Sequence, residues 1–435
     1  MSLNKWYWTG LLLLSLVRTG LGQPDSLNEA KRMQWFHDAK LGIFIHWGIY
    51  AVKGIDESWS FFNEYLSHED YLKQTEGFTA SKYDPAEWAH LIKTSGAKYT
   101  VITTRHHDGF SLWNSRGSEL NAVNSAARRD VLTPFIQAAK QQGLRIGLYY
   151  SLPDWSFTDY PNETKNIKRY DANADTQRWQ RFLSYYQGQL DELESAYHPD
   201  LWWFDGDWEF SAEKWEAAKV RKRLLSANKD VIINSRLAGH GDYATPEQGL
   251  PVNKPVDPYW ELCMTMNDSW GYQPNDTNYK SSRQIIQIFA NVIGHGGNLL
   301  LDIGPKADGT IPAEQSQVLL DMGRWTQKHQ EAIYGSQAGL PPGYFYGPST
   351  LSADGQTLYL FLPYHPQGQI ELRGVKNQIN RIRVVGDGTK LDHQVMMKPY
   401  WSTHAGLIYI DVPDYVLDPD MTVIAVQLKG KLELE

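Results

Sequence analysis

Residues 200–208 read DLWWFDGDW, a run of large apolar side chains that ends in two carboxylates around a glycine. An apolar run of this length, closed by a glycine, predicts a buried strand over Asp200–Gly206. Because side chains alternate across a strand, Trp203 and Asp205 share one face, so an indole lies beside a carboxylate. Asp207 follows the glycine and is expected in a loop.

Comparable apolar runs recur along the chain and alternate with amphipathic segments that predict helices. The expected strands are Leu41–Trp47, Lys98–His107, Arg145–Leu152, Asp200–Gly206, Asp230–Leu237, Tyr259–Thr265 and Asn298–Gly304. The expected helices are Pro85–Ser95, Val131–Gln142, Ala174–Ser195, Ala212–Ala227, Ser281–Ile293 and Pro312–Ile333. This order predicts an α/β fold, a (β/α)8-like (TIM-type) barrel over residues 23–338 with one or two helices absent.

The pattern changes from about Tyr344 onward, where short alternating runs are spaced by Pro, Gly and Asp. The expected strands there are Thr357–Leu362, Gln369–Leu372, Arg381–Val385, Leu407–Val412 and Thr422–Leu428. They predict a C-terminal antiparallel β-sandwich over residues 344–435, joined to the barrel by Gly339–Gly343. We expect this sandwich to pack on the barrel and stabilise it.

The composition is that of a globular protein, with 42% hydrophobic and 21% charged residues in 435. Lys and Arg number 42 against 50 Asp and Glu, and no dense basic cluster is present, which argues against a nucleic-acid partner. Aromatic residues make up 13% of the chain, with 17 Trp. Flat amphipathic rings suit a sugar ligand, and they equally suit an aromatic barrel core.

Residues 1–22 predict a secretory signal peptide. Lys5 precedes the apolar run Trp8–Val17, and the small residues Gly20 and Gly22 stand before Gln23. The run is too short to span a bilayer, which needs about 20 residues, so we expect export to the periplasm or outside the cell without stable membrane insertion. A single cysteine, Cys263, allows no internal disulfide.

Polar side chains stand at the ends of five of the expected strands. They are His46, His106, His107, Tyr150, Asp205 and Arg236. Because the active site of a β/α barrel lies where the strands end, these residues predict one shared site.

Hydrolysis of a glycosidic bond requires two carboxyl groups, so Asp205 needs a partner. Glu247 lies in a proline-containing loop that could swing over a bound sugar. Glu261 lies inside an expected strand, and Glu57 lies in the first loop. All three remain candidates on these grounds.

Four motifs carry a family resemblance. They are FIHWG at 44–48, TRHHDGF at 104–110, WWFDGDW at 202–208 and GNLLLDIGP at 297–305. Together they resemble the family 29 glycoside hydrolases, the retaining α-L-fucosidases. The resemblance implies an exo-acting hydrolase that removes terminal α-L-fucosyl residues from oligosaccharides or glycoconjugates through a covalent fucosyl-enzyme.

The same resemblance implies roles for individual residues. Asp205 matches the nucleophile, and His46, His106 and His107 match residues that bind fucose hydroxyls. Tyr150, Trp203 and Arg236 resemble further members of the sugar pocket. Glu57 and Trp59 resemble a Glu-Trp pair of the family, although Ser58 is inserted between them here. Glu247 is favoured as the acid/base because of its spacing from Asp205 and Arg236, with Glu261 as the alternative.

The expected site needs no metal and no organic cofactor, and its expected partner is a fucosylated glycan. Three alternatives stay open. The scaffold could serve an α-L-galactosidase or another related glycosidase. His and Asp at strand ends also describe a metal-dependent barrel hydrolase. A non-catalytic sugar-binding protein would keep the pocket without the chemistry.

Overall fold

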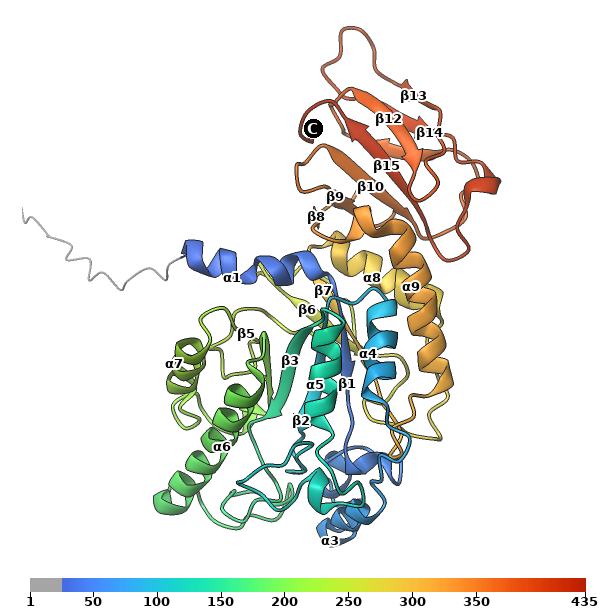
Figure 1. Cartoon of the computed structure of the whole chain (residues 1–435). Coiled ribbons are helices and arrows are strands. Elements are labelled where there is room, and N and C mark those ends of the chain that lie inside the picture. The colour runs from blue at the N-terminus through green and yellow to red at the C-terminus, as the bar shows by residue number, and fades with distance from the viewer. Residues whose placement is uncertain (1–25) are drawn as a thin grey trace, which may run out of the picture.

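The first domain is built on seven parallel strands. The structure, a computed structural model, describes residues 26–435, so the expected signal peptide lies outside the described residues (Figure 1). The strands are β1 (Leu41–Ile45), β2 (Tyr99–Arg105), β3 (Arg145–Ser151), β4 (Leu201–Asp205), β5 (Ile232–Ile233), β6 (Glu261–Thr265) and β7 (Asn298–Ile303). They pair in the order β5-β4-β3-β2-β1-β7-β6, which leaves β5 and β6 at the two edges.

An irregular segment, 243–247, closes the gap between those two edges. Its parallel bridges are Asn234–Tyr243, Ala244–Trp260 and Glu247–Cys263. The backbone N–H of Cys263 donates to the carbonyl of Pro246 at 3.1 Å, and that of Gln248 donates to the carbonyl of Cys263 at 2.9 Å. The segment therefore occupies the position of the eighth strand of the barrel, and the expected (β/α)8-like architecture is confirmed.

Aromatic rings fill the barrel interior at the N-terminal ends of the strands. Helix α1 (Ser26–Ala39) sets Phe36 against Tyr99 and Tyr243, at ring-centroid distances of 5.8 and 4.5 Å. A Cβ atom at position 42 would lie 2.4 Å from the Tyr99 ring, so glycine at 42 makes room for it. Close packing of this kind leaves a floor beneath the site.

Six helices cover the barrel close to where the sequence predicts them. They are α4 (Pro85–Thr94), α5 (Leu132–Gln141), α6 (Thr176–Tyr197), α7 (Ala217–Ala227), α8 (Ser282–Gly294) and α9 (Ala313–Ile333). Helix α7 begins at Ala217 instead of Ala212, because Glu216 adopts a left-handed conformation with φ 54°. No helix lies between β5 and β6 among the described residues, in line with the expected absence of one or two.

The C-terminal domain is an antiparallel sandwich of two sheets. One has the order β12-β15-β10-β9-β8, and the other has the order β11-β14-β13. The strands are β8 (Gln337–Ala338), β9 (Ser349–Leu351), β10 (Thr357–Leu362), β11 (Ile370–Arg373), β12 (Ile379–Val384), β13 (His393–Met396), β14 (Leu407–Ile410) and β15 (Thr422–Leu428). Because β8 already pairs with β9, this sheet begins before the boundary expected at residue 344.

The sandwich rests on α8 and α9, away from the loops that follow the barrel strands (Figure 1). Alternation along β10 explains the contact, because Leu358 and Leu360 fill the sandwich core while Phe361 faces the barrel domain. The Phe361 ring lies 6.2 Å from that of Trp325 on α9. The Trp325 indole N–H donates to the carbonyl of Met421 at 2.8 Å, which ties the two domains together.

Candidate active site

A cavity of about 140 Å³ opens where the barrel strands end. Its lining residues are Phe44, His46, Glu57, Trp59, His106, His107, Tyr149, Trp203, Asp205, Trp208, Arg236, Glu247 and Trp270. A cavity of this volume is on the scale of one small ring. A larger hollow of about 840 Å³ lies on the sandwich loops around His365 and Asp411, far in sequence from these residues.

Asp205 is the last residue of β4, and its carboxylate faces the cavity with three neighbours. The Tyr149 hydroxyl donates to Oδ2 at 2.9 Å, and Nη1 of Arg236 donates to Oδ1 at 3.0 Å. His107 Nε2 lies 3.6 Å from Oδ2. The expected pairing of Trp203 and Asp205 on the inward face is confirmed, since both line the cavity.

Arg236 joins Asp205 to Glu247. Its Nη2 donates to Oε2 of Glu247 at 2.6 Å while Nη1 holds Asp205, so adjacent nitrogens of one guanidinium carry the two carboxylates. The Glu247 side chain is 39% exposed and that of Asp205 is 12% exposed. Asp205 therefore lies in the depth of the cavity and Glu247 at its rim.

The sequence places Glu247 in a proline-containing loop, and the structure shows that the backbone of this segment pairs with β6. The closing segment 243–247 is held by backbone bonds to β6, and Nε of Arg236 donates to Oγ1 of Thr245 at 3.1 Å. Glu247 thus belongs to the segment that closes the barrel wall. The sequence did not predict a strand here, because the segment contains Pro246 and pairs only through isolated bridges.

Two adjacent histidines enter the cavity because β2 ends just before them. The strand stops at Arg105 after a register shift between Thr103 and Arg105, so the alternation of a strand no longer applies to His106 and His107. His106 Nδ1 lies 2.5 Å from the hydroxyl of Ser58, and His107 Nδ1 lies 2.6 Å from that of Ser151. Each ring is thereby fixed through Nδ1, and Nε2 is the nitrogen available to a ligand.

His46 is fixed in the same manner by an acid. Its Nδ1 lies 2.7 Å from Oδ1 of Asp302 on β7, and both residues are buried. Burial lowers the pKa of His46 well below its ordinary value and raises that of Asp302 well above its ordinary value. The pair therefore carries no net charge.

The other two histidines are also neutral. Burial is the main cause that lowers the pKa of His106 well below its ordinary value. Burial, followed by the charge of Arg105, lowers the pKa of His107 to about 3. A neutral imidazole offers one donor and one acceptor, which suits hydroxyl groups better than a charged ligand.

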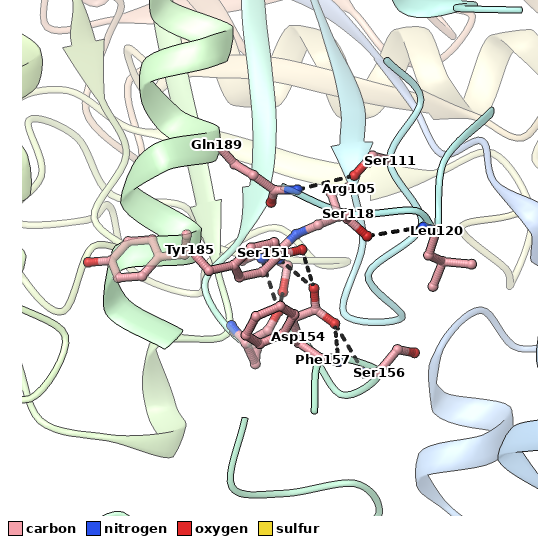
Figure 2. A network of polar contacts seen from close by, with 12 residues as sticks. Arg105, Ser111, Ser118, Leu120, Ser151, Asp154, Ser156, Phe157, Tyr185 and Gln189 are labelled. Atoms are coloured by element: carbon pink, nitrogen blue, oxygen red, sulfur yellow. Dashed lines mark hydrogen bonds and ion pairs between the residues drawn. The ribbon is translucent and has the colours of Figure 1, made fainter. Parts of the chain in front are cut away.

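Arg105, Ser151, Asp154 and Tyr185 form a network of polar contacts (Figure 2) next to the residues that hold His107. Nη1 of Arg105 donates to Oδ2 of Asp154 at 2.7 Å, and the Tyr185 hydroxyl donates to the same oxygen at 2.8 Å. Nη2 of Arg105 donates to the carbonyl of Ser151, the residue whose hydroxyl meets His107. Arg105 is fully buried, so this ion pair fixes the backbone on which the histidine depends.

Glu57 and Trp59 both line the cavity, and Ser58, the residue inserted between them, orients a histidine of the site. The hydroxyl of Ser58 contacts His106 and accepts the backbone N–H of Asp108 at 2.9 Å. Glu57 accepts the backbone N–H of Gly271 at 2.5 Å, and burial raises the pKa of Glu57 to about 8. Glu57 is therefore protonated at neutral pH and can donate a hydrogen bond.

Tyr150 does not belong to the site, and its neighbour takes its place. The Tyr150 hydroxyl donates to Oε1 of Gln189 on α6 at 2.8 Å, and the ring lies under Arg105 at 4.3 Å. Tyr149 points the other way, and its hydroxyl contacts Asp205. Both faces of a barrel strand are buried, so apolar alternation carries no sign of which tyrosine faces inward.

Glu261 lies beneath the site instead of in it. It is fully buried on β6, where Oε1 accepts the indole N–H of Trp203 at 3.0 Å and Oε2 accepts the hydroxyl of Tyr99. It does not line the cavity. Glu261 therefore supports the indole of Trp203, over which Arg236 stacks at 4.7 Å.

Phe44 and Trp270 complete the wall and were not among the predicted residues. The Trp270 ring lies 4.9 Å from His46 and 6.0 Å from Phe44. With Trp203, at 5.0 Å from Phe44, they form an apolar corner of the cavity. Trp270 lies beyond β6 in a stretch without strand or helix pattern, so no sequence signal marked it.

Residues 26–435 contain neither a cluster of metal ligands nor a helix that could span a membrane. Nowhere in this part of the chain do three His, Cys, Asp or Glu side chains gather as ligands of one metal ion. Likewise, none of the helices described is long and apolar enough to cross a bilayer.

The sequence of this chain is similar to those of known alpha-L-fucosidases. The family model for alpha-L-fucosidase matches residues 22–331. The chain is 32% identical over 363 residues to the alpha-L-fucosidase of Branchiostoma floridae, covering 75% of this chain and 79% of that one. It is 31% identical over 347 residues to the tissue alpha-L-fucosidase of Homo sapiens, covering 72% of each.

Solved structures of alpha-L-fucosidases are also similar to the structure of this chain. Alpha-L-fucosidase isoenzyme 1 from Paenibacillus thiaminolyticus superposes with a TM-score of 0.84 at 32% identity, over 93% of this chain and 100% of that one. A GH29 alpha-L-fucosidase from Bacteroides thetaiotaomicron, trapped as a covalent intermediate with 2-fluoro-fucosyl fluoride, superposes with a TM-score of 0.81 at 26% identity. That match covers 92% of this chain and 96% of the other.

The buried acid Glu261 predicts a pH-dependent stability. Burial raises its pKa from 4.5 to about 7, so between these values the folded protein binds more protons than the unfolded chain. Its contribution to stability is present below pH 4.5 and is lost as the pH rises through 7. Glu261→Gln removes this titration. Relative to wild type, its free energy of unfolding should rise by about 3 kcal/mol between pH 4.5 and 8. Urea denaturation at both pH values measures this difference, and parallel pH profiles of the two proteins would contradict it.

Proposed function

The chain belongs to the alpha-L-fucosidase family of glycoside hydrolases, and from that membership we propose that its cavity binds a terminal α-L-fucosyl unit, which Asp205 and Glu247 release with retention. The observation that carries the proposal is the guanidinium of Arg236, which holds one carboxylate in the depth of the cavity and the other at its rim. Retaining glycosidases need two carboxyl groups on one site, about 5–5.5 Å apart.

In the first step, a carboxylate oxygen of Asp205 attacks the anomeric carbon and the bond from that carbon to the leaving oxygen breaks. Glu247, protonated in the Michaelis complex, gives its proton to that oxygen. A covalent fucosyl-Asp205 ester results. In the second step, the carboxylate of Glu247 takes a proton from water, the water oxygen bonds to the anomeric carbon, and the ester bond breaks.

Arg236 links the two steps through charge. In the free enzyme its positive charge is shared between two carboxylates. When Asp205 becomes an ester it loses its negative charge, so Glu247 is then the one carboxylate that Arg236 contacts. The same hydrogen bond holds Glu247 in place as the base that the second step requires.

The remaining wall suits a 6-deoxy sugar. The three neutral histidines and the protonated Glu57 present donors and acceptors for ring hydroxyls. The apolar corner of Phe44, Trp203 and Trp270 suits the methyl group on the sugar ring. Because the cavity admits one ring, the substrate is a terminal fucosyl residue of a glycan, which makes the enzyme exo-acting.

Azide rescue tests the two assignments. Asp205→Gly should lose turnover of an aryl α-L-fucoside, and azide should restore it with the inverted β-fucosyl azide as product. Glu247→Ala should lose about 10²–10⁴-fold on substrates with poor leaving groups, the usual range for an acid/base residue. With the aryl fucoside, azide should give the retained α-fucosyl azide from that variant. NMR of the products distinguishes the two anomers.

Glu261→Gln is the matched control, since it removes a buried carboxylate that lies outside the cavity. It should give no azide product. A retained azide from this variant would move the acid/base role to Glu261, and β-fucose as the first product of the wild type would overturn the retaining mechanism.

The two adjacent tyrosines provide a second test. Tyr149→Phe removes the hydroxyl that donates to Asp205, and we expect kcat/KM on the aryl fucoside to fall by about tenfold or more, as for the loss of one hydrogen bond to a charged group. Tyr150→Phe removes a hydrogen bond of the outer face, so it should lower stability by about 1 kcal/mol and leave kcat/KM near wild type. Equal kinetic losses in both variants would argue against the assigned orientations.

Export across a membrane is also proposed, on the pattern of residues 1–22. The mature chain should then begin at Gln23 when the gene is expressed with its full N-terminus. Mass spectrometry of the purified protein measures this end, and an intact Met1 in protein from the exporting compartment would contradict cleavage.

A further inference from the structure

The rim of the cavity displays an indole to solvent. Trp208 lines the cavity and is 55% exposed, while Trp203 beside Asp205 is buried. The Trp208 ring stacks beside that of Trp59, with a centroid distance of 6.2 Å and an interplanar angle of 17°. It stands edge-on to His107, at 5.8 Å and 80°.

The residues on either side of Trp208 are firmly anchored. Trp208 is the middle residue of the 3-10 turn η4 (Asp207–Glu209). Oδ2 of Asp207 accepts the backbone N–H of Ala238 at 2.9 Å, and its carbonyl accepts the indole N–H of Trp215 at 3.0 Å. These bonds fix the turn on its N-terminal side.

Glu209 fixes the other side with three bonds. Oε1 accepts the indole N–H of Trp155 at 2.7 Å, and Oε2 accepts the hydroxyl of Tyr160 at 2.6 Å and the amide of Asn162 at 2.7 Å. Five hydrogen bonds thus hold the turn, yet about half of the Trp208 side chain remains exposed to solvent. A ring fixed in advance loses little conformational freedom when a ligand covers it, which favours binding.

The position of the ring defines which part of a substrate it meets. The cavity admits one ring, so the group bonded to that ring lies outside, at the rim. Glu247 stands at the same rim, where the leaving oxygen must receive its proton. The leaving group therefore lies at the part of the cavity wall that carries both the acid and the exposed indole.

We propose that Trp208 is the platform on which the leaving group stacks, and that this group is a pyranose whose apolar C–H face covers the indole. This inference rests on the proposed function, since it names the other half of the same substrate. Trp208 is then a specificity residue for the sugar that carries the fucosyl unit, and it takes no part in the chemistry at the anomeric carbon.

Two substrates with the same fucosyl unit test the proposal. One is a disaccharide whose leaving group is a pyranose, and the other is α-L-fucosyl fluoride, whose leaving group is too small to reach the rim. For Trp208→Ala, kcat/KM on the disaccharide should fall about tenfold further than kcat/KM on the fluoride, the scale of one lost ring contact. Trp208→Phe keeps a flat ring and should recover most of that loss.

Trp401→Ala is the matched control, because Trp401 is 74% exposed on the C-terminal domain and belongs to no site described above. It should leave the ratio of the two substrates unchanged. Equal losses of Trp208→Ala on both substrates would show that the ring serves the fucosyl site or the fold, and no loss on the disaccharide would show that nothing stacks there. Either result overturns the inference about Trp208. The proposed function still holds in that case if the wild type hydrolyses the fluoride with retention. Failure of the wild type on the fluoride would remove both.

Discussion

The guanidinium of Arg236 lies between the two carboxyl groups of the cavity and forms an ion pair with each of them. Unit charges about 4 Å apart interact by about 4 kcal/mol at the effective dielectric constant near a protein surface. Without that charge, two carboxylates on the wall of one small cavity would repel each other. Arg236 also donates to Thr245, so the same side chain that balances the charges pins the closing segment 243–247 to the barrel. Barrel closure and site electrostatics thus depend on one residue.

The polar groups buried beneath the cavity wall lower the stability of the fold unless they are paired. Arg105, Glu261 and Asp302 are all buried, and burial of an unpaired charge is expensive. Each has a partner that also orients a residue of the site. Arg105 and Asp154 fix the backbone of Ser151, and Asp302 fixes His46. A fully apolar layer would give a stable barrel, but it would leave the histidine rings free to rotate.

The site divides into a deep part and a rim, and the two parts serve different halves of a substrate. Neutral histidines, a protonated glutamic acid and an apolar corner recognise one ring in the depth. At the rim stand the more exposed acid and the indole of a turn held by five hydrogen bonds. Recognition of the fucosyl unit and selection of its carrier can therefore vary independently, because the first depends on strand ends and the second on loops.

Local sequence patterns are enough to predict the barrel, the sandwich and most residues of the site. Apolar runs ending in His46, His106, Asp205 and Arg236 can be recognised because the ends of parallel strands must meet at one edge of the sheet. Where the local pattern gives no signal, the direction of a side chain follows from tertiary contacts alone. Tyr149 replaced Tyr150 because both faces of β3 are buried, and Glu247 proved to be part of the barrel wall because its pairing partners are distant in sequence. Ser58 and Trp270 joined the site for the same reason, since contacts between residues far apart in the chain leave no periodicity behind.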